Sequence, residues 1–364
     1  MKSKLFIADL RSNCSNGIST GHFFPVAAMY QQLLKERCDV VVAGGPVYKN
    51  RFKDDELLLL PYNVCGTTLK DKWHTMKNAM KLFKEAKGQT IVIQQGSVLT
   101  SLIAIALFYH RTSKLFMIQY SNEGVRSFFK RVLFRFAKCK IDGMICPNDD
   151  VGHAYGISYC VVPDYIYTGS VEKVKSNGDK LDLKKYDFCM VGRIVEEKGI
   201  VEVAEKFANS SYKIIIAGKA ANGGLENRLK KICENATNIT LILGYVSDEK
   251  YEMILKTSRY AFLNYQGEYS RRSSGVVYDT LFAGIPVIGQ FCTALKFIQT
   301  CNMGYLYGNL KDVSGDTIDE LLKDDVVAEY KRNISKYYSI HKEYKQKLID
   351  YLCNFSDSDA KIRE

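Results

Sequence analysis

Residues 187–199 read DFCMVGRIVEEKG, an apolar run that ends at a glycine and leads into a helix start. The run Asp187–Val191 predicts a buried strand that Gly192 ends, after which come Arg193 and, five residues later, Lys198. Two cations beside a helix N-terminus form a phosphate site without a metal, because free backbone N–H groups and the helix dipole add to the side-chain charge. The alternative is a pair of solvated charges on a loop.

Short apolar runs alternate with amphipathic stretches on both sides of this segment, which is typical of parallel sheets covered by helices. The polar segment 163–185 predicts a linker between two doubly wound α/β domains, 1–165 and 166–340. A final helical stretch is predicted over 326–353. The C-terminal helix and tail, 341–364, are predicted to pack back across both domains. Ligands of such sheets bind beyond the carboxyl ends of the strands, so we expect the active site in the cleft between the domains. The predicted strands are 4–10, 39–43, 90–94, 115–120, 143–146, 160–162, 187–191, 213–217, 239–243, 260–263 and 286–288.

The composition is that of a globular protein of two domains, with 364 residues, 46% hydrophobic and 25% charged. Eleven cysteines, an odd number with no Cys-x-x-Cys pair, indicate reduced thiols in a cytoplasmic protein. The first residues lack the pattern of a signal peptide, and the longest apolar run, 102–108, is too short to span a bilayer. No Asp-x-Asp pair or His-rich cluster predicts a metal site.

The net charge of +11 is concentrated in the first half of the chain, because residues 1–165 hold 22 Lys and Arg against 13 Asp and Glu. Helical spacing over 125–138 predicts an amphipathic helix with an apolar stripe that faces the core. Phe134 would then lie in the middle of the opposite, basic face, beside Arg131 and Arg135. This pattern suits contact with an anionic membrane surface. An ordinary helix with one stray exposed Phe is equally compatible, and no nucleic-acid motif is present.

A second cluster lies between Tyr265 and Ile288. Gly275 lets a ligand approach the backbone where a helix begins, and Asp279, one turn later, can accept a hydrogen bond from a ribose hydroxyl. Gly284 ends that helix and Pro286 begins the next strand. This cluster suggests a site for a nucleotide diphosphate.

In order and spacing, these motifs resemble those of family-4 (group 1) glycosyltransferases, which have the GT-B fold of two Rossmann-like domains facing across a cleft. The resemblance is specific over 187–290 and only topological before it, and it implies that domain 1–165 binds the acceptor and domain 166–340 binds the nucleotide-sugar donor. It implies an α/β enzyme of hexosyltransferase type that transfers a sugar from a nucleotide-diphosphate sugar to an acceptor hydroxyl with retention. The acceptor would be a saccharide or lipid-linked saccharide in polysaccharide, O-antigen or capsule-type assembly, and the enzyme would be cytoplasmic or peripheral at the inner face of the cell membrane. No cofactor and no nucleic-acid partner are expected.

The resemblance also implies roles for residues of the second half. Arg193 and Lys198 would hold the donor diphosphate with Ser274 and Gly275. Asp279 stands at the family's second glutamate, while the first falls on Arg271, so that Glu268 is the nearest acid. The ribose and base would be held by Asp279 and by three residues of one turn, namely Gly244, Tyr245 and Val246.

In the first half, Gly17 and Gly21 form the Gly-rich loop that the family uses at the donor diphosphate. The family's active-site histidine is missing, and Gln94-Gln95-Gly96 and residues 119–123 stand at the corresponding positions. His22, Tyr120, Asn122 and Glu123 are therefore candidate catalytic residues together with Glu268. Two alternatives stay open: a nucleotide-sugar 2-epimerase on the same fold, and a non-catalytic protein that binds nucleotide sugars.

Overall fold

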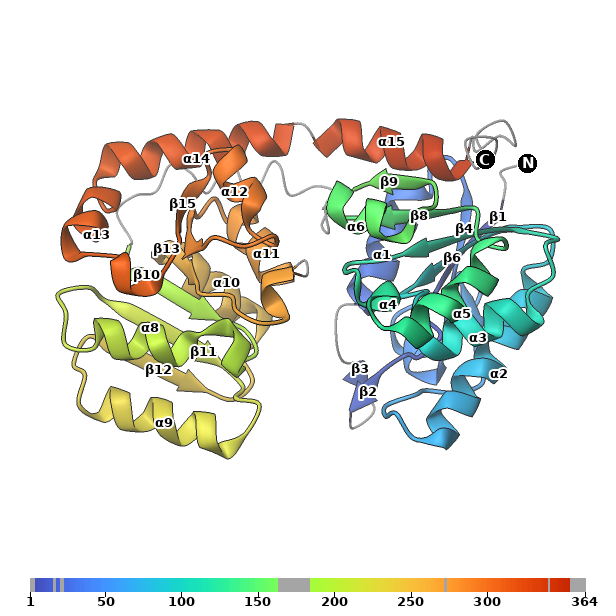
Figure 1. Cartoon of the computed structure of the whole chain (residues 1–364), viewed down its shortest axis with the longest axis horizontal. Coiled ribbons are helices and arrows are strands. Elements are labelled where there is room, and N and C mark those ends of the chain that lie inside the picture. The colour runs from blue at the N-terminus through green and yellow to red at the C-terminus, as the bar shows by residue number, and fades with distance from the viewer. Residues whose placement is uncertain are drawn as a thin grey trace. The chain divides into compact units, whose positions relative to one another are not determined.

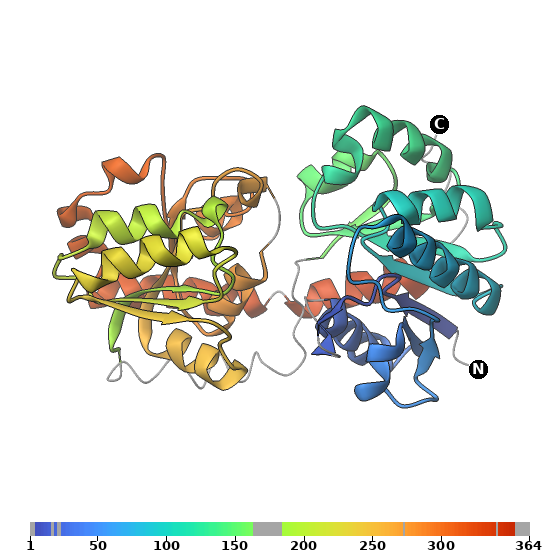
Figure 2. The ribbon, with the colours of Figure 1, turned by 90° about the horizontal axis from the view of Figure 1, so that it is seen from below.

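The computed structural model describes residues 4–15, 18–19, 23–162, 184–271, 274–339 and 341–353. The chain divides into two compact units, the first comprising Met1–Thr168 with Lys342–Glu364 and the second Gly169–His341 (Figure 1). Each unit holds one parallel sheet with helices on both of its faces (Figure 2). The predicted acceptor-binding and donor-binding roles of the two domains stay predictions.

The first unit is a seven-stranded parallel sheet in the order β5-β4-β1-β6-β7-β8-β9. Because successive side chains of a strand face opposite sides, Leu5 and Ile7 of β1 pack with α1 and α15, whereas Phe6 and Ala8 pack with α2, α3 and α5. The strand order reverses between β1 and β6, which is where doubly wound sheets bind ligands. The elements are β1 Lys4–Ala8, β2 Cys14–Ser15, β3 Ile18–Ser19, α1 Phe23–Leu34, β4 Asp39–Gly44, η1 Pro46–Asn50, β5 Leu57–Leu59, α2 Leu69–Glu85, β6 Thr90–Gln94, α3 Leu99–Phe108, β7 Lys114–Ile118, α4 Glu123–Arg126, α5 Phe128–Lys138, β8 Gly143–Cys146, α6 Asp149–Tyr155, β9 Tyr159–Val161 and α15 His341–Cys353.

The second unit is a six-stranded parallel sheet in the order β12-β11-β10-β13-β14-β15, which reverses between β10 and β13. Phe188 and Met190 of β10 face a core with α8 and α9, and Cys189 and Val191 face one with α10 and α11. The elements are β10 Tyr186–Val191, η3 Glu196–Lys198, α8 Ile200–Phe207, β11 Ile214–Gly218, α9 Gly223–Glu234, β12 Ile239–Leu243, α10 Asp248–Lys256, β13 Ser258–Leu263, η4 Tyr269–Arg271, α11 Gly275–Phe282, β14 Val287–Gln290, α12 Lys296–Thr300, β15 Gly304–Tyr307, η5 Leu310–Asp312, α13 Gly315–Leu321 and α14 Asp324–Ser339.

All eleven predicted strands are present, whereas β5, β15 and α2 were not predicted from the sequence. The signal for α2 is a capping box, in which the Thr68 hydroxyl accepts from Asp71 N and Asp71 Oδ2 accepts from Thr68 N. The helical stretch predicted over 326–353 corresponds to α14 and α15, which lie on either side of residue 340, a residue outside the described ranges. Ile334, Tyr337 and Tyr338 of α14 belong to a core of the second unit, whereas Leu348, Ile349 and Leu352 of α15 belong to a core of the first.

The prediction that Phe134 lies exposed on the basic face of α5 is wrong. Phe134 is only 3% exposed, and its ring packs edge-on against Tyr155 with 5.3 Å between ring centroids. The predicted core stripe is divided: Ala137 lies in the core with Phe134, and Val125 and Leu133 pack against it, whereas Phe128 is 80% and Phe136 67% exposed. Helical spacing defines the two faces of a helix but not which of them the rest of the molecule covers.

Candidate active site

Three glycines bring the ends of β10, β11 and β12 together at the carboxyl edge of the second sheet. A Cβ on Gly218 would lie 1.8 Å from the carbonyl oxygen of Gly192, so no other residue fits there without a backbone shift. Gly244 N donates to Gly218 O over 3.0 Å. Gly192 (φ 96°) and Gly244 (φ 109°) adopt backbone conformations that favour glycine. The segments that follow the three strands therefore start side by side.

Lys198 lies buried at this edge, at the end of η3, and is 6% exposed. Its Nζ lies 3.5 Å from the position that a Cβ on Gly192 would take, and 5.5 Å from the centre of the Tyr269 ring. Burial, and then the charge of Arg193, lower the pKa of Lys198 to about 8. Among the described residues no carboxylate forms an ion pair with it. The site is therefore electropositive and lacks a resident anion from the described protein.

Arg193 follows Gly192 and is exposed. The backbone around it is fixed by Ile194, whose N–H donates to Lys219 O over 3.0 Å and whose carbonyl accepts from Ala221 N over 2.9 Å. The positive charge of Arg193 adds to burial in lowering the pKa of Lys198, so the two cations interact electrostatically.

The first turn of α11 lies next to Gly192. A Cβ on Gly192 would lie 3.3 Å from Val276 Cγ2, in the first turn of this helix. Ser274, the N-cap residue, makes no side-chain capping bond, because its hydroxyl lies 2.8 Å from the Tyr265 hydroxyl in the protein interior. Ser274 and Gly275 thus begin a helix whose positive dipole end lies beside Gly192 and Lys198.

Asp279 is half-buried on α11, and its Oδ2 accepts a hydrogen bond from the Tyr251 hydroxyl over 3.1 Å. Burial and the Asp279 carboxylate raise the pKa of Tyr251 well above its ordinary value.

Glu268 is exposed on the turn that follows β13. This turn is tied to η3 because Gln266 N donates to Glu197 O over 2.7 Å, and the ring of Tyr269, the next residue after Glu268, faces Lys198. Beside the turn is a cavity of about 540 Å³ that Arg271, at the place of the family's first glutamate, helps to line. The sequence did not single out Gln290 and Phe291, which also line it.

The turn Gly244–Val246 lies at the end of β12, next to Gly218. Val246 is half-buried, whereas the side chain of Tyr245 is 87% exposed. An exposed aromatic ring at a strand end is free to stack on a planar ligand.

In the first unit, the carboxyl edge of the sheet carries several polar side chains. Gln94, at the end of β6, is 4% exposed, and neither its amide oxygen nor its nitrogen has a hydrogen-bond partner among the residues that the structure describes. Asp9 is buried too, and accepts from the Tyr48 hydroxyl over 2.8 Å while burial raises its pKa. Tyr120 is half-buried against the core. Gly17, Gly21, His22 and the side chain of Glu123 lie outside the described residues.

Where the structure describes the chain, no group of three or more His, Cys, Asp or Glu side chains is placed to hold a metal ion. Nor is any described helix long and apolar enough to cross a bilayer. The eleven cysteines all lie within the described ranges, and none of them forms a disulfide.

Residues 172–339 match the model of the family described as glycosyl transferases group 1. Solved structures similar to the chain include an E. coli trehalose-6-phosphate structure bound with UDP-2-fluoro glucose (10% identity, TM-score 0.69, covering 97% of this chain and 100% of that one). A glycosyltransferase involved in avilamycin A biosynthesis is 14% identical (TM-score 0.61, 97% and 99%). A trehalose-phosphate synthase (UDP-forming) from Burkholderia xenovorans in complex with glucose-6-phosphate is 10% identical (TM-score 0.64, 96% and 99%). No curated protein matches the chain.

The likeness to these structures, over nearly the whole chain, establishes the fold as the GT-B fold of glycosyltransferases, two Rossmann-like α/β units, and confirms the predicted fold class. The match to glycosyl transferases group 1 lies within the second unit, and the predicted resemblance is confirmed at that level.

Proposed function

We propose that this glycosyltransferase moves a hexose from a nucleotide-diphosphate sugar to an acceptor hydroxyl, with retention at the sugar carbon. The observation that carries the proposal is the environment of Lys198, a buried ammonium without an ion-pair partner among the described residues, next to the start of α11. A buried cation without a partner carries a desolvation cost that a bound anion offsets, and a diphosphate is the anion that the group 1 match implies.

The proposed chemistry needs no metal from the protein. The bond between the sugar carbon and the diphosphate breaks and leaves an oxocarbenium-like carbon, while negative charge grows on the departing phosphate. Lys198, Arg193 and the N–H groups at Ser274 and Gly275 are preorganised to stabilise that charge. Gly17 and Gly21 are proposed to contact the same diphosphate.

The remaining predicted residues complete the proposal. Asp279 would bind the ribose, and the turn Gly244, Tyr245 and Val246 would hold the base. Glu268 would contact a hydroxyl of the donor sugar, as the family's first glutamate does. Tyr120 and Glu123 would be catalytic residues that act on the acceptor.

We propose polysaccharide, O-antigen or capsule-type glycan assembly as the setting, with a saccharide or lipid-linked saccharide as acceptor. The excess of basic residues in the first half supports work at the inner face of the cell membrane, in the cytoplasm. UDP-sugars are the first donors to test, because the structural neighbours include complexes with UDP-2-fluoro glucose and with glucose-6-phosphate.

The test is an assay of free nucleoside diphosphate after incubation of the full chain with UDP-, GDP- and ADP-sugars, with and without saccharide acceptors. We expect release that depends on an acceptor, and a product that keeps the donor's anomeric configuration in NMR spectra. An altered nucleotide sugar formed without acceptor would identify an epimerase. Tight nucleotide binding with no turnover of any donor would identify a binding protein.

A further inference from the structure

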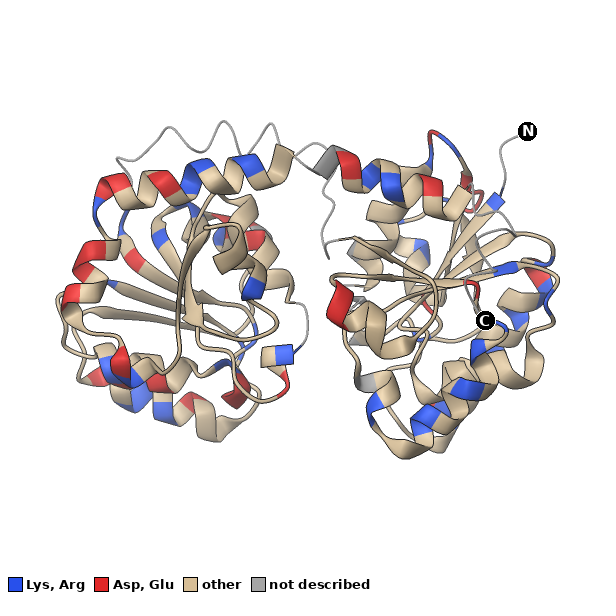
Figure 3. Cartoon of the chain, turned by 45° about the horizontal axis from the view of Figure 1, so that its top comes forward, with Lys and Arg blue, Asp and Glu red and all other residues tan. Residues whose placement is uncertain are grey.

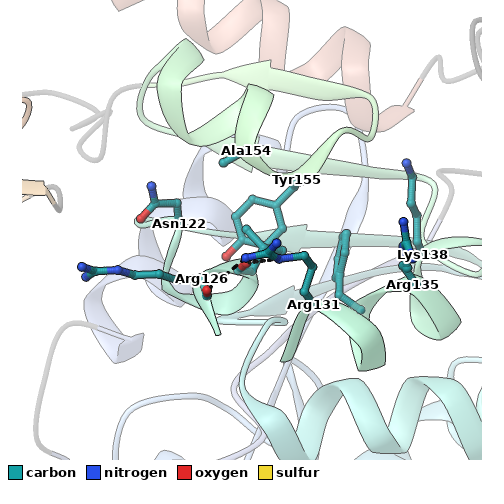
Figure 4. A pocket seen from close by; sticks show the side chains of 9 residues that line it. Asn122, Arg126, Arg131, Arg135, Lys138, Ala154 and Tyr155 are labelled. Atoms are coloured by element: carbon teal, nitrogen blue, oxygen red, sulfur yellow. Dashed lines mark hydrogen bonds between the residues drawn. The ribbon is translucent and has the colours of Figure 1, made fainter. Parts of the chain in front are cut away.

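A cavity of about 490 Å³ lies between α4, α5 and α6 of the first unit (Figure 4). Its lining includes Asn122, from the segment that follows β7, but neither Asp9 nor Gln94. Four of its nine lining residues are cationic and none is acidic. The lining comprises Asn122, Val125, Arg126, Arg131, Phe134, Arg135, Lys138, Ala154 and Tyr155.

The cavity has a fixed floor and one fixed cation. Phe134 and Tyr155 are both buried, and the Tyr155 hydroxyl donates to Ser121 O over 3.0 Å. Arg131 is held by two carbonyl oxygens at the end of α4, because its Nε donates to Val125 O over 3.2 Å and its Nη2 to Arg126 O over 3.3 Å. Three of the five N–H donors of the guanidinium are not used in these bonds.

The other three cations of the cavity also lack a carboxylate partner. Within the described ranges, none of Arg126, Arg131, Arg135 or Lys138 forms an ion pair. Figure 3 shows that Lys and Arg outnumber Asp and Glu along the helices of this part of the first unit. A cluster of unpaired cations around a concave surface attracts an anion, and guanidinium groups match the geometry of phosphate.

An apolar row runs along α5 beside these cations. Phe128, Val132 and Phe136 are spaced four residues apart and are 80%, 36% and 67% exposed, with Phe129 next to them at 67%. Arg131 and Arg135, also four apart, lie one residue before Val132 and Phe136, so the basic row and the apolar row are neighbours on the helix surface. Leu107, 62% exposed, adds to the apolar surface on α3, which packs against α5.

We propose that this surface docks on an anionic lipid bilayer, with a lipid phosphate in the cavity and with Phe128, Phe129 and Phe136 inserted at the boundary between headgroups and acyl chains. Phosphate and apolar groups lie side by side in a phospholipid, and here unpaired cations and exposed aromatic rings lie side by side on one helix. A nucleic acid would match the cations but would leave the apolar row in water. This inference deepens the proposed membrane location, replaces Phe134 as the inserted residue, and does not depend on sugar transfer.

The experiment is cosedimentation of the full chain with vesicles of phosphatidylcholine alone or with one third phosphatidylglycerol. We expect binding only to the anionic vesicles. Phe128→Ser with Phe136→Ser, and separately Arg131→Gln with Arg135→Gln, should each lower the partition coefficient at least tenfold. The matched control is Arg332→Gln with Lys336→Gln, two exposed cations four residues apart on α14, together with Met253→Ser on α10.

Several results would overturn the inference. Equal binding to both vesicle types, or equal losses in the control, would do so. Binding that persists in the Phe variants but is competed by inorganic phosphate would identify a site for free phosphate, and capture of RNA with the same loss in the Arg variants would identify a nucleic-acid surface. Nucleotide binding measured on each variant reports that it is folded. Sugar transfer with no vesicle binding would overturn this inference alone, and vesicle binding with no sugar transfer would overturn the proposed function alone.

Discussion

The cationic site around Lys198 and the cationic surface of α5 differ in solvent exposure. Lys198 is buried at a strand edge of the second unit, and its pKa falls to about 8. Arg131 and Arg135 stand exposed on a helix of the first unit. A buried charge is held in place before its ligand arrives and is little screened by salt, at a cost in stability, whereas an exposed charge costs little and is screened. The buried arrangement suits the stabilisation of a transition state, and the exposed arrangement suits a surface that binds a membrane reversibly.

The largest effect that separates the two sites is expected for Lys198→Met. Removal of one buried donor to a departing phosphate should lower kcat/KM by about a thousandfold. The same change should stabilise the unliganded protein by about 3 kcal/mol at pH 7. The lowering of the Lys198 pKa from 10.5 to about 8 corresponds to the free energy that the folded state spends on keeping this ammonium charged, and methionine removes that charge. Kinetics with the donor found in the panel, and denaturant unfolding, provide the two measurements.

Lys256→Gln, an exposed lysine on α10, is the control for this variant. It should change neither quantity appreciably. Loss of stability in Lys198→Met would mean that the ammonium has a compensating partner in the unliganded protein and would contradict the comparison.

Arg193→Ala should have the next largest effect, a fall in kcat/KM of about a hundredfold, the scale of one oxyanion donor. Because Arg193 is exposed, its removal should leave the free energy of unfolding nearly unchanged. Unchanged turnover of this variant on its true donor would remove Arg193 from the mechanism.

The reach of sequence reasoning also differs between the two regions. The places of Gly192, Arg193 and Lys198 in the fold could be predicted because a strand end, a glycine and a helix start lie within thirteen residues of chain, whereas their binding roles stay predictions. The place of Phe134 could not be predicted, because its burial depends on α6 and Tyr155, which pack against it from elsewhere in the unit. Gln94 likewise stands out only by its lack of hydrogen-bond partners, which is a tertiary property.

The third effect concerns pH. Below about pH 8, Lys198 is already charged in the free protein, so nucleoside diphosphate affinity should be flat. Above it, binding must first restore the proton, and Kd should rise up to tenfold per pH unit. Calorimetry at pH 7, 8 and 9 measures this. Lys198→Arg, which stays charged throughout, should give a flat profile, and parallel profiles for the two proteins would assign the titration to another group.

The smallest effect expected is the difference in salt dependence. The Debye length shortens from about 10 Å at 0.1 M to about 3 Å at 1 M salt, which screens exposed charges much more than buried ones. Between 0.1 and 0.5 M NaCl, vesicle partitioning should fall about fivefold, while nucleoside diphosphate affinity should fall by about twofold or less. Salt does not screen the apolar contacts of Phe128 and Phe136 with the membrane, so residual vesicle binding at high salt should disappear in their Ser variants. Equal salt slopes for the two ligands would show that Lys198 is as accessible to counterions as the arginines of α5, and the distinction between a buried and an exposed anion site would fail.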